Sequence, residues 1–390
     1  MKVKALPSDF IVHEESSLVL RRERSEYAVF RLSKTSWDTF DLLDLLARTW
    51  GLTRQDISVG GMKDRHGSTE QLISVRSPHG TPRPLSQKNF SLDFQGWSST
   101  PVTARDVVGN RFEITVRDLT ERETNLIVGN APVAARDGFP NYFDEQRFGS
   151  ARHGAGFMGK EIFLGHREKA LRLYFTPSKH DDQKTRKLKK CIIDNWGHWD
   201  RCSAMGFGEY GRLLAYLSEN RLGYHQALEK IDRRFLVFVL NAYQSFLFNE
   251  VLGRWLALEA GDVPLLSLRY AFGEYRFFPS LPPAMAQRLR AAQLPVPGYD
   301  TLCDDPAVRT ILESVLVEEG ITLSDLRVRN MHRIHVGGVP RAAVVVPEDL
   351  SVSTPEPDEL SPGKRKMLLR FFLARGSYAT ILLKRLTLPQ

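Results

Sequence analysis

Cysteine is scarce in this chain. Only Cys191, Cys202 and Cys303 occur among 390 residues, and they are widely spaced and odd in number. A disulfide framework uses an even set of cysteines, and a zinc site uses them in short paired spacings. We therefore expect neither kind of site, and the low cysteine content is typical of a reducing compartment.

Long apolar segments are also missing. No apolar run approaches the roughly 20 residues that a membrane-spanning helix needs. The start of the chain, MKVKALPSDF, has no apolar core of a signal peptide. These absences predict a cytoplasmic protein with no membrane partner.

The composition that remains is that of an ordinary globular protein with a basic surplus. Apolar residues make up 42% of the chain and charged residues 26%. The length allows two or three domains with cores of their own. The net charge of +8 and the pI near 9.3 fit a polyanionic partner without establishing one.

The most informative segment is GGMKDRHGSTEQ, from Gly60 to Gln71. It places the carboxylate of Asp64 beside Lys63, Arg65 and His66. Neighbouring cations favour the charged form of a carboxylate, so Asp64 is expected to be ionised at neutral pH. An ionised carboxylate suits a nucleophile or an anionic base, whereas a solvated surface loop is the alternative interpretation. The segment does not match the phosphate-binding P-loop pattern.

The distribution of elements predicts an α+β fold. Apolar, β-branched runs flank the Asp64 loop, which predicts a connection between two strands. We expect a catalytic domain of residues 1–152 and 340–390, with a mixed, largely antiparallel sheet. The two ends of the chain would both contribute strands to this sheet. An inserted, mainly helical α+β domain would occupy residues 153–339. The elements that carry this prediction are strands at 9–14, 26–32, 111–116, 342–346, 368–373 and 379–383, and helices from 38 or 39 to 50, from 120, and over 233–258.

Six segments in order along the chain resemble the motifs of one family, the TruD-type pseudouridine synthases. They are DFIVHE (9–14), GMKDRHGSTEQ (61–71), NRF (110–112), NYFDEQRFG (141–149), NAYQSFLFN (241–249) and GSYAT (376–380). The resemblance therefore covers nearly the whole chain. The chain departs from the family pattern at Asp144, where a glycine is usual, and at Gly67, where alanine is common.

The resemblance implies an isomerase that converts uridine to pseudouridine in tRNA, at position 13 in particular, although family members can modify other structured RNA. It implies no cofactor and no metal, and we expect a monomer. Asp64 matches the catalytic aspartate. The other implied site residues are Lys63, Asn110 and Glu14 in support of it, Phe112 as a platform for the base, and Arg65, Tyr142, Phe143, Gln146 and Arg147 as RNA contacts.

Several alternatives stay open at this level. Periodicity alone would make Phe112 a core residue of its strand, and the segment from Tyr142 to Arg147 could be an aromatic turn that packs inside the protein. Asn241, Ser245 and Asn249 form a polar stripe that could fix a loop, line an RNA groove or serve helix packing. The rival functions are a non-catalytic RNA-binding protein on the same fold and a cofactor-free glycoside-cleaving enzyme. The latter normally uses a second carboxylate, and none stands out.

Overall fold

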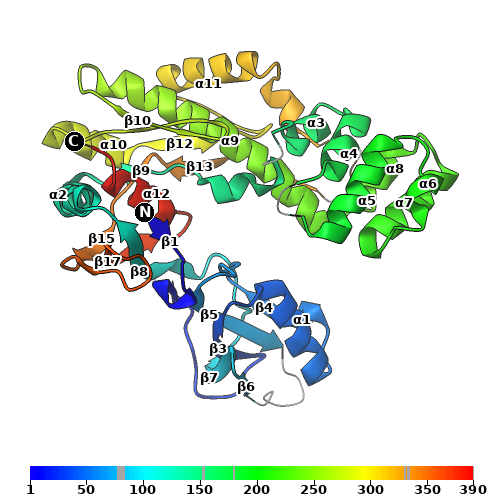
Figure 1. Ribbon diagram of the computed structural model, residues 1–390, viewed down its shortest axis with the longest axis horizontal. Coiled ribbons are helices and arrows are strands. Elements are labelled where there is room, and N and C mark those ends of the chain that lie inside the picture. Colours follow the sequence, from blue (N-terminus) through cyan, green and yellow to red (C-terminus); the bar gives the residue numbers. More distant parts are fainter. Residues whose placement is uncertain (77–83, 152–153, 179–180, 329–330, 332–333, 390) are drawn as a thin grey trace. The chain divides into compact units, whose positions relative to one another are not determined.

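Figure 1 shows the computed structural model of the chain, which describes all residues except 77–83, 152–153, 179–180, 329–330, 332–333 and 390. The chain forms two compact units. The first unit comprises Met1–Phe139, Pro279–Ala286 and Val345–Gln390, and the second comprises Pro140–Phe278 and Gln287–Val344. Both ends of the chain therefore belong to the first unit. The inserted domain at 153–339 stays a prediction.

The first unit is built on one large sheet with the strand order β15-β17-β8-β2-β5-β3-β7-β6. β2 and β5 are parallel, and the other pairings in the sheet are antiparallel. N-terminal β2 and C-terminal β17 both pair with β8, so the expected common sheet of the two chain ends is confirmed. The strands are β1 (Lys2–Val3), β2 (Phe10–Ser16), β3 (Tyr27–Thr35), β4 (Ile57–Val59), β5 (Ser68–Arg76), β6 (Ser86–Gln87), β7 (Phe90–Ser98), β8 (Val107–Leu119), β15 (Glu348–Val352), β16 (Glu356–Pro357) and β17 (Arg365–Ala374).

Two helices of this unit begin where the sequence predicts, and the first of them also ends there. In α1 (Thr39–Trp50) the Asp38 carboxylate accepts the N–H of Phe40 at 2.8 Å, and Gly51 ends the helix in the left-handed conformation with φ of 65°. α2 (Glu121–Asp137) begins with the predicted capping box of Thr120 and Glu123. The apolar face of α1 packs on β3 and β5 in one cluster, which includes Leu42, Leu43, Leu46, Phe30 and Ile73.

The strand predicted at 379–383 is wrong, because these residues begin helix α12 (Ala379–Leu386). A short apolar run does not distinguish a buried helix from a strand. The helix is fixed by Asn130 of α2, whose side-chain amide donates to the carbonyl oxygens of Leu386 and Leu388 at 3.0 and 2.9 Å. Contacts from distant parts of the chain therefore decide the conformation here.

The second unit is mainly helical and is centred on the long helix α9 (Arg233–Ala260). α9 is long and apolar enough to cross a membrane by composition, but 72% of its most apolar window is buried in the fold. This burial is that of a core helix. The remaining elements of the unit and its borders are β9 (Phe139–Pro140), α3 (Met158–Phe163), α4 (Arg167–Phe175), α5 (Gln183–Asp194), α6 (Asp200–Ser203), α7 (Gly208–Glu219), α8 (Tyr224–Glu229), β10 (Leu266–Tyr270), β11 (Gly273–Phe277), α10 (Pro283–Ala291), β12 (Gln293–Val296), α11 (Pro306–Glu318), β13 (Val339–Ala342) and β14 (Val344–Val345).

One disulfide bond corrects the expectation drawn from the cysteine count. Cys191 in α5 and Cys202 in α6 are joined, with their Cα atoms 6.0 Å apart, and Cys303 is free. The two cysteines meet because α5 and α6 pack against each other after a short connection. Sequence spacing alone does not reveal such a contact, and a formed disulfide is not the state expected in a reducing compartment.

Candidate active site

The Asp64 loop joins β4 to β5 in the first unit, as the sequence predicts. Its last residue, Gly67, lies against β2, where a Cβ atom would be 2.5 Å from the carbonyl oxygen of Phe10. Only a residue without a side chain allows this approach without a backbone shift. The parallel pairing of β2 with β5 and the antiparallel pairing of β2 with β8 bring Glu14 and Asn110 to the same region of the sheet.

Both carboxylate oxygens of Asp64 are held. One accepts a hydrogen bond from the ammonium of Lys4, and the other accepts the backbone N–H of His66 at 2.8 Å. The side chain of Asp64 is 22% exposed, so the carboxylate is reachable from solvent. Burial alone would raise the pKa of Asp64, but the bonds from Lys4 and His66 and their positive charges outweigh it and hold this pKa below its usual value. Asp64 is therefore an ionised, oriented carboxylate at neutral pH.

Lys63 points to a second cluster beside Asp64. Its ammonium lies 2.6 Å from the carboxylate of Glu14 and donates to the side-chain oxygen of Asn110 at 2.5 Å. Glu14 also accepts the backbone N–H of Leu72 at 3.2 Å. The three predicted support residues thus meet each other, whereas Lys4 takes the position beside Asp64. The sequence analysis did not single out Lys4, because the loop motif itself offered nearer cations.

Phe112 lies in β8 and is buried, with 7% of its surface exposed. Its ring stacks on Phe371 of β17 at 5.3 Å and meets the edge of Phe10 at 6.1 Å. The ammonium of Lys4 lies over the ring of Phe10, 4.2 Å from its centroid. Phe112 is therefore linked to Asp64 through Phe10 and Lys4. The use of its ring as a platform for a base stays a prediction.

The predicted RNA contacts divide between the units. Arg65 is exposed in the first unit, whereas Tyr142, Phe143, Gln146 and Arg147 belong to the second. Gln146 is exposed, and Phe143 and Arg147 are half-buried. Tyr142 is fully buried, its hydroxyl donates to the carbonyl oxygen of Arg276 at 3.2 Å, and burial raises its pKa. This placement is the packing alternative raised from the sequence, and contact of Tyr142 with RNA stays a prediction.

The polar stripe of α9 holds this aromatic segment. The side chain of Asn249 accepts the backbone N–H of Phe143 and donates to its carbonyl oxygen, both at 2.9 Å. Ser245 accepts from Arg147 at 3.3 Å and donates to the carbonyl oxygen of Asn241 at 2.7 Å. Asp144, at the usual glycine position, is only 3% exposed and does not have a positive φ. Its backbone therefore needs no glycine, and its carboxylate is not on the surface.

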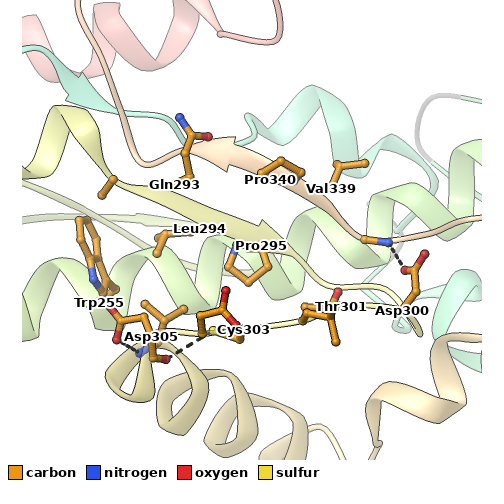
Figure 2. A pocket seen from close by; sticks show the side chains of 15 residues that line it. Trp255, Gln293, Leu294, Pro295, Asp300, Thr301, Cys303, Asp305, Val339 and Pro340 are labelled. Atoms are coloured by element: carbon orange, nitrogen blue, oxygen red, sulfur yellow. Dashed lines mark hydrogen bonds between the residues drawn. The ribbon is translucent and has the colours of Figure 1, made fainter.

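The second unit also has a pocket of about 470 Å³ that contains none of the predicted site residues. Figure 2 shows Trp255 at one end of it and Asp300 at the other, where the Asp300 carboxylate accepts the N–H of Gly338 at 2.6 Å. Strands β12 and β13 form one wall. Across the described part of the chain, no group of three or more His, Cys, Asp or Glu side chains could hold a metal ion. The carboxylate of Asp64, in contrast, lies in the predicted motif, is held at both oxygens and is 22% exposed.

Comparison with known proteins gives the family of the chain. The model of one family, described as tRNA pseudouridine synthase D (TruD), matches residues 1–386. The chain belongs to the TruD family of pseudouridine synthases. A Methanocaldococcus jannaschii relative named "Probable tRNA pseudouridine synthase D 2" is 30% identical, with 99% of this chain and 91% of that protein covered. A Methanococcus maripaludis relative named "Probable tRNA pseudouridine synthase D 1" is 29% identical, with 99% of each chain covered.

A solved TruD structure from Methanosarcina mazei supports the same assignment at the level of the fold. It superposes with a TM-score of 0.70 and 26% identity over 99% of this chain and 93% of that one. Pseudouridine synthases are isomerases, so this TruD-family chain is an enzyme rather than a binding module alone. The family assignment does not itself identify the reacting group, which is why the Asp64 geometry matters.

Proposed function

We propose that this chain isomerises uridine 13 of tRNA to pseudouridine and that Asp64 is its catalytic carboxylate. The observation that carries the proposal is the ionised Asp64 side chain, held at both oxygens and still 22% exposed, inside the segment that resembles the family signature. The relatives' names specify tRNA, and the basic net charge of +8 fits a polyanionic substrate. No cofactor takes part in the proposed reaction.

The reaction rearranges the nucleotide without net gain or loss of atoms. The bond between the sugar C1′ and N1 of uracil breaks, the base turns, and a bond from C1′ to C5 forms. The proton on C5 then leaves and N1 gains a proton. An ionised carboxylate can begin this sequence in two ways, by attack on C1′ or by removal of the sugar 2′ proton to give a glycal. The low pKa of Asp64 suits both routes, because each requires the deprotonated form.

The other residues act around this carboxylate. Lys4 keeps Asp64 ionised and oriented, and Glu14 and Asn110 hold the side chain of the adjacent Lys63. A uridine inside folded RNA must leave its stack to reach such a group. We assign the aromatic surface that receives it to Phe112, which requires the ring to become more accessible than its 7% exposure when RNA binds. Arg65, Phe143, Gln146 and Arg147 would contact the RNA.

The alternative is an RNA-binding or RNA-folding protein in which isomerisation is not the essential activity. The exposure of Arg65 and Gln146 would serve such a role equally well. A role in RNA binding alone gives no reason for an oriented carboxylate beside the pair of Lys63 and Glu14, so we favour the enzyme.

The test is pseudouridine mapping on unmodified bulk tRNA, by chemical adduct formation and primer extension, after treatment with wild type or Asp64→Ala. We expect one new site, at position 13, with the wild type and none with the variant, while both proteins bind the RNA. Modification at another site would refute the assignment of position 13. No modification by either protein, on RNA that both bind, would favour the RNA-binding alternative.

A further inference from the structure

Lys34 is a lysine whose side chain is buried beneath the Asp64 loop, with only 1% of its surface exposed. Its backbone lies in β3 and pairs with Thr69 of β5 on one side and Phe90 of β7 on the other. Lysine is almost never fully buried unless its ammonium is paired, because removal of the charge from water is costly. The pairing with β5 and β7 fixes the backbone of Lys34 and so the origin of its side chain.

The ammonium of Lys34 donates to three backbone carbonyl oxygens. It lies 2.9 Å from that of Trp37, 2.9 Å from that of Asp64 and 3.5 Å from that of Lys63. An ammonium has three N–H donors, so all of them are used. Two of the three acceptors are the carbonyl oxygens of Lys63 and Asp64, the neighbouring residues at the centre of the site. Lys34 therefore holds the stretch of backbone from which the Asp64 carboxylate projects.

Other side chains hold other parts of the loop. The amide of Gln71 donates to the carbonyl oxygen of Gly61 at 3.0 Å, and the hydroxyl of Thr39 donates to that of Lys63 at 3.3 Å. Both of these side chains are neutral. Among the described residues, Lys34 provides the side-chain hydrogen bond to the carbonyl oxygen of Asp64.

We propose that Lys34 is a positioning residue of the isomerase, which fixes the Asp64 carboxylate through the backbone without touching the substrate. The proposal rests on the function proposed above. A displacement of a reacting group by about 1 Å can cost about a hundredfold in rate. Loss of the Lys34 ammonium should therefore act on the chemical step rather than on RNA binding.

The ionisation of Lys34 gives this contact a pH dependence. Burial lowers the pKa of Lys34 to about 8. The negative charges of Asp64 and Asp38 raise this pKa, and the positive charge of Lys63 lowers it, but burial has the largest effect. As the pH rises through about 8, the ammonium loses its charge and one of its three donors. We expect the rate of isomerisation to fall over the same range.

The experiment measures kcat and KM for tRNA between pH 6 and 10, for wild type, Lys34→Met and Lys189→Met. For Lys34→Met we expect kcat at pH 7 to fall roughly ten- to hundredfold with KM within about twofold, and the alkaline fall near pH 8 to disappear. Lys189 is the matched control, because it is also a buried lysine, 8% exposed and 3.0 Å from Asp181, but it belongs to the second unit. Its variant should keep the wild-type pH profile.

A Lys34→Met protein with wild-type kcat and an unchanged alkaline fall would overturn the proposal. If that variant does not fold, Lys34→Arg replaces it, since a guanidinium stays ionised and should also remove the fall near pH 8. A wild type that is inactive on tRNA would instead contradict the proposed function. In that case NMR titration of the lysine ammonium groups decides, because deprotonation of Lys34 should shift the backbone amide signals of Asp64 and Arg65, and unmoved signals would overturn the inference.

Discussion

Lys4 has a left-handed backbone conformation, with φ of 64°, which a residue other than glycine seldom adopts. Its side chain points to Asp64 and lies over the ring of Phe10. Strained conformations of this kind persist where the surrounding structure holds them, often at functional sites. The conformation and the two contacts together indicate that Lys4 is placed to control the charge of Asp64.

The ionisation of Asp64 provides a test of this role. Lys4 lowers the pKa of Asp64, so its removal should raise that pKa and move the acid side of the activity profile to higher pH. We expect Lys4→Met to show this shift and a kcat at pH 7 lower on the order of tenfold, because one oxygen of the carboxylate is no longer held. The measurement is kcat from pH 4 to 8.

Lys2→Met is the matched control for this variant. The Lys2 side chain is 62% exposed, and its ammonium lies 3.4 Å from the carboxylate of Asp118. Lys2→Met should leave the acid side of the profile of kcat against pH unchanged from the wild type. An unshifted profile in Lys4→Met would show that Lys4 does not set the pKa of Asp64.

Single residues also show where the sequence analysis reached its limit. Lys63, Asn110 and Glu14 bond to one another because β2, β5 and β8 are neighbours in one sheet, whereas the carboxylate of Asp64 bonds to Lys4 instead. Lys34 was not predicted, since a lysine in a β-rich run gives no sign that its ammonium is buried. Residues that act through backbone carbonyl groups carry no motif of their own.

At the scale of elements, local signals predicted the helices with clear ends. Asp38 and Gly51 delimit α1, and the Thr120 capping box begins α2. α12 was predicted as a strand, because its helical form depends on contacts with Asn130 that sequence periodicity does not contain. The pairing of Cys191 with Cys202 was missed for the same reason. Contacts between elements decide these cases.

The attachment of the aromatic segment to α9 leads to a prediction at this scale. Asn249 is 2% exposed and bonds to both backbone groups of Phe143. Asn249→Ala leaves the N–H of Phe143 without that partner and should lower the free energy of unfolding by about 2 kcal/mol. Thermal and chemical denaturation followed by circular dichroism measure this loss.

Asn241→Ala serves as the comparison, since Asn241 lies on the same helix and is less buried than Asn249. Its loss should change the free energy of unfolding by no more than about 0.5 kcal/mol. Equal effects of the two substitutions would contradict the view that Asn249 anchors the segment.

At the scale of the whole molecule, the surplus of basic residues predicts how the protein binds RNA. A net charge of +8 allows several phosphates to be neutralised, and each such contact releases counterions. We expect the affinity for unmodified tRNA to fall roughly tenfold or more between about 50 and 200 mM salt. Fluorescence anisotropy with labelled tRNA measures this dependence.

Asp64→Asn should give the same salt dependence as the wild type, because the carboxylate contacts no phosphate in the proposed mechanism. A salt-independent affinity would contradict an electrostatic mode of RNA binding. Basic residues occur in both units of the fold. A single charge substitution should therefore change the affinity for tRNA less than the change in salt does.

In the proposed mechanism, the carboxylate of Asp64 carries out the isomerisation. The most direct measurement is the single-turnover rate of pseudouridine formation in unmodified tRNA, for wild type, Asp64→Asn and Asp41→Asn. Asp41 is an exposed aspartate of α1 in the same unit, so it receives the same substitution outside the site. We expect no detectable product with Asp64→Asn and the wild-type rate with Asp41→Asn. Product formation by a folded, RNA-bound Asp64→Asn protein at a rate near that of the wild type would contradict it.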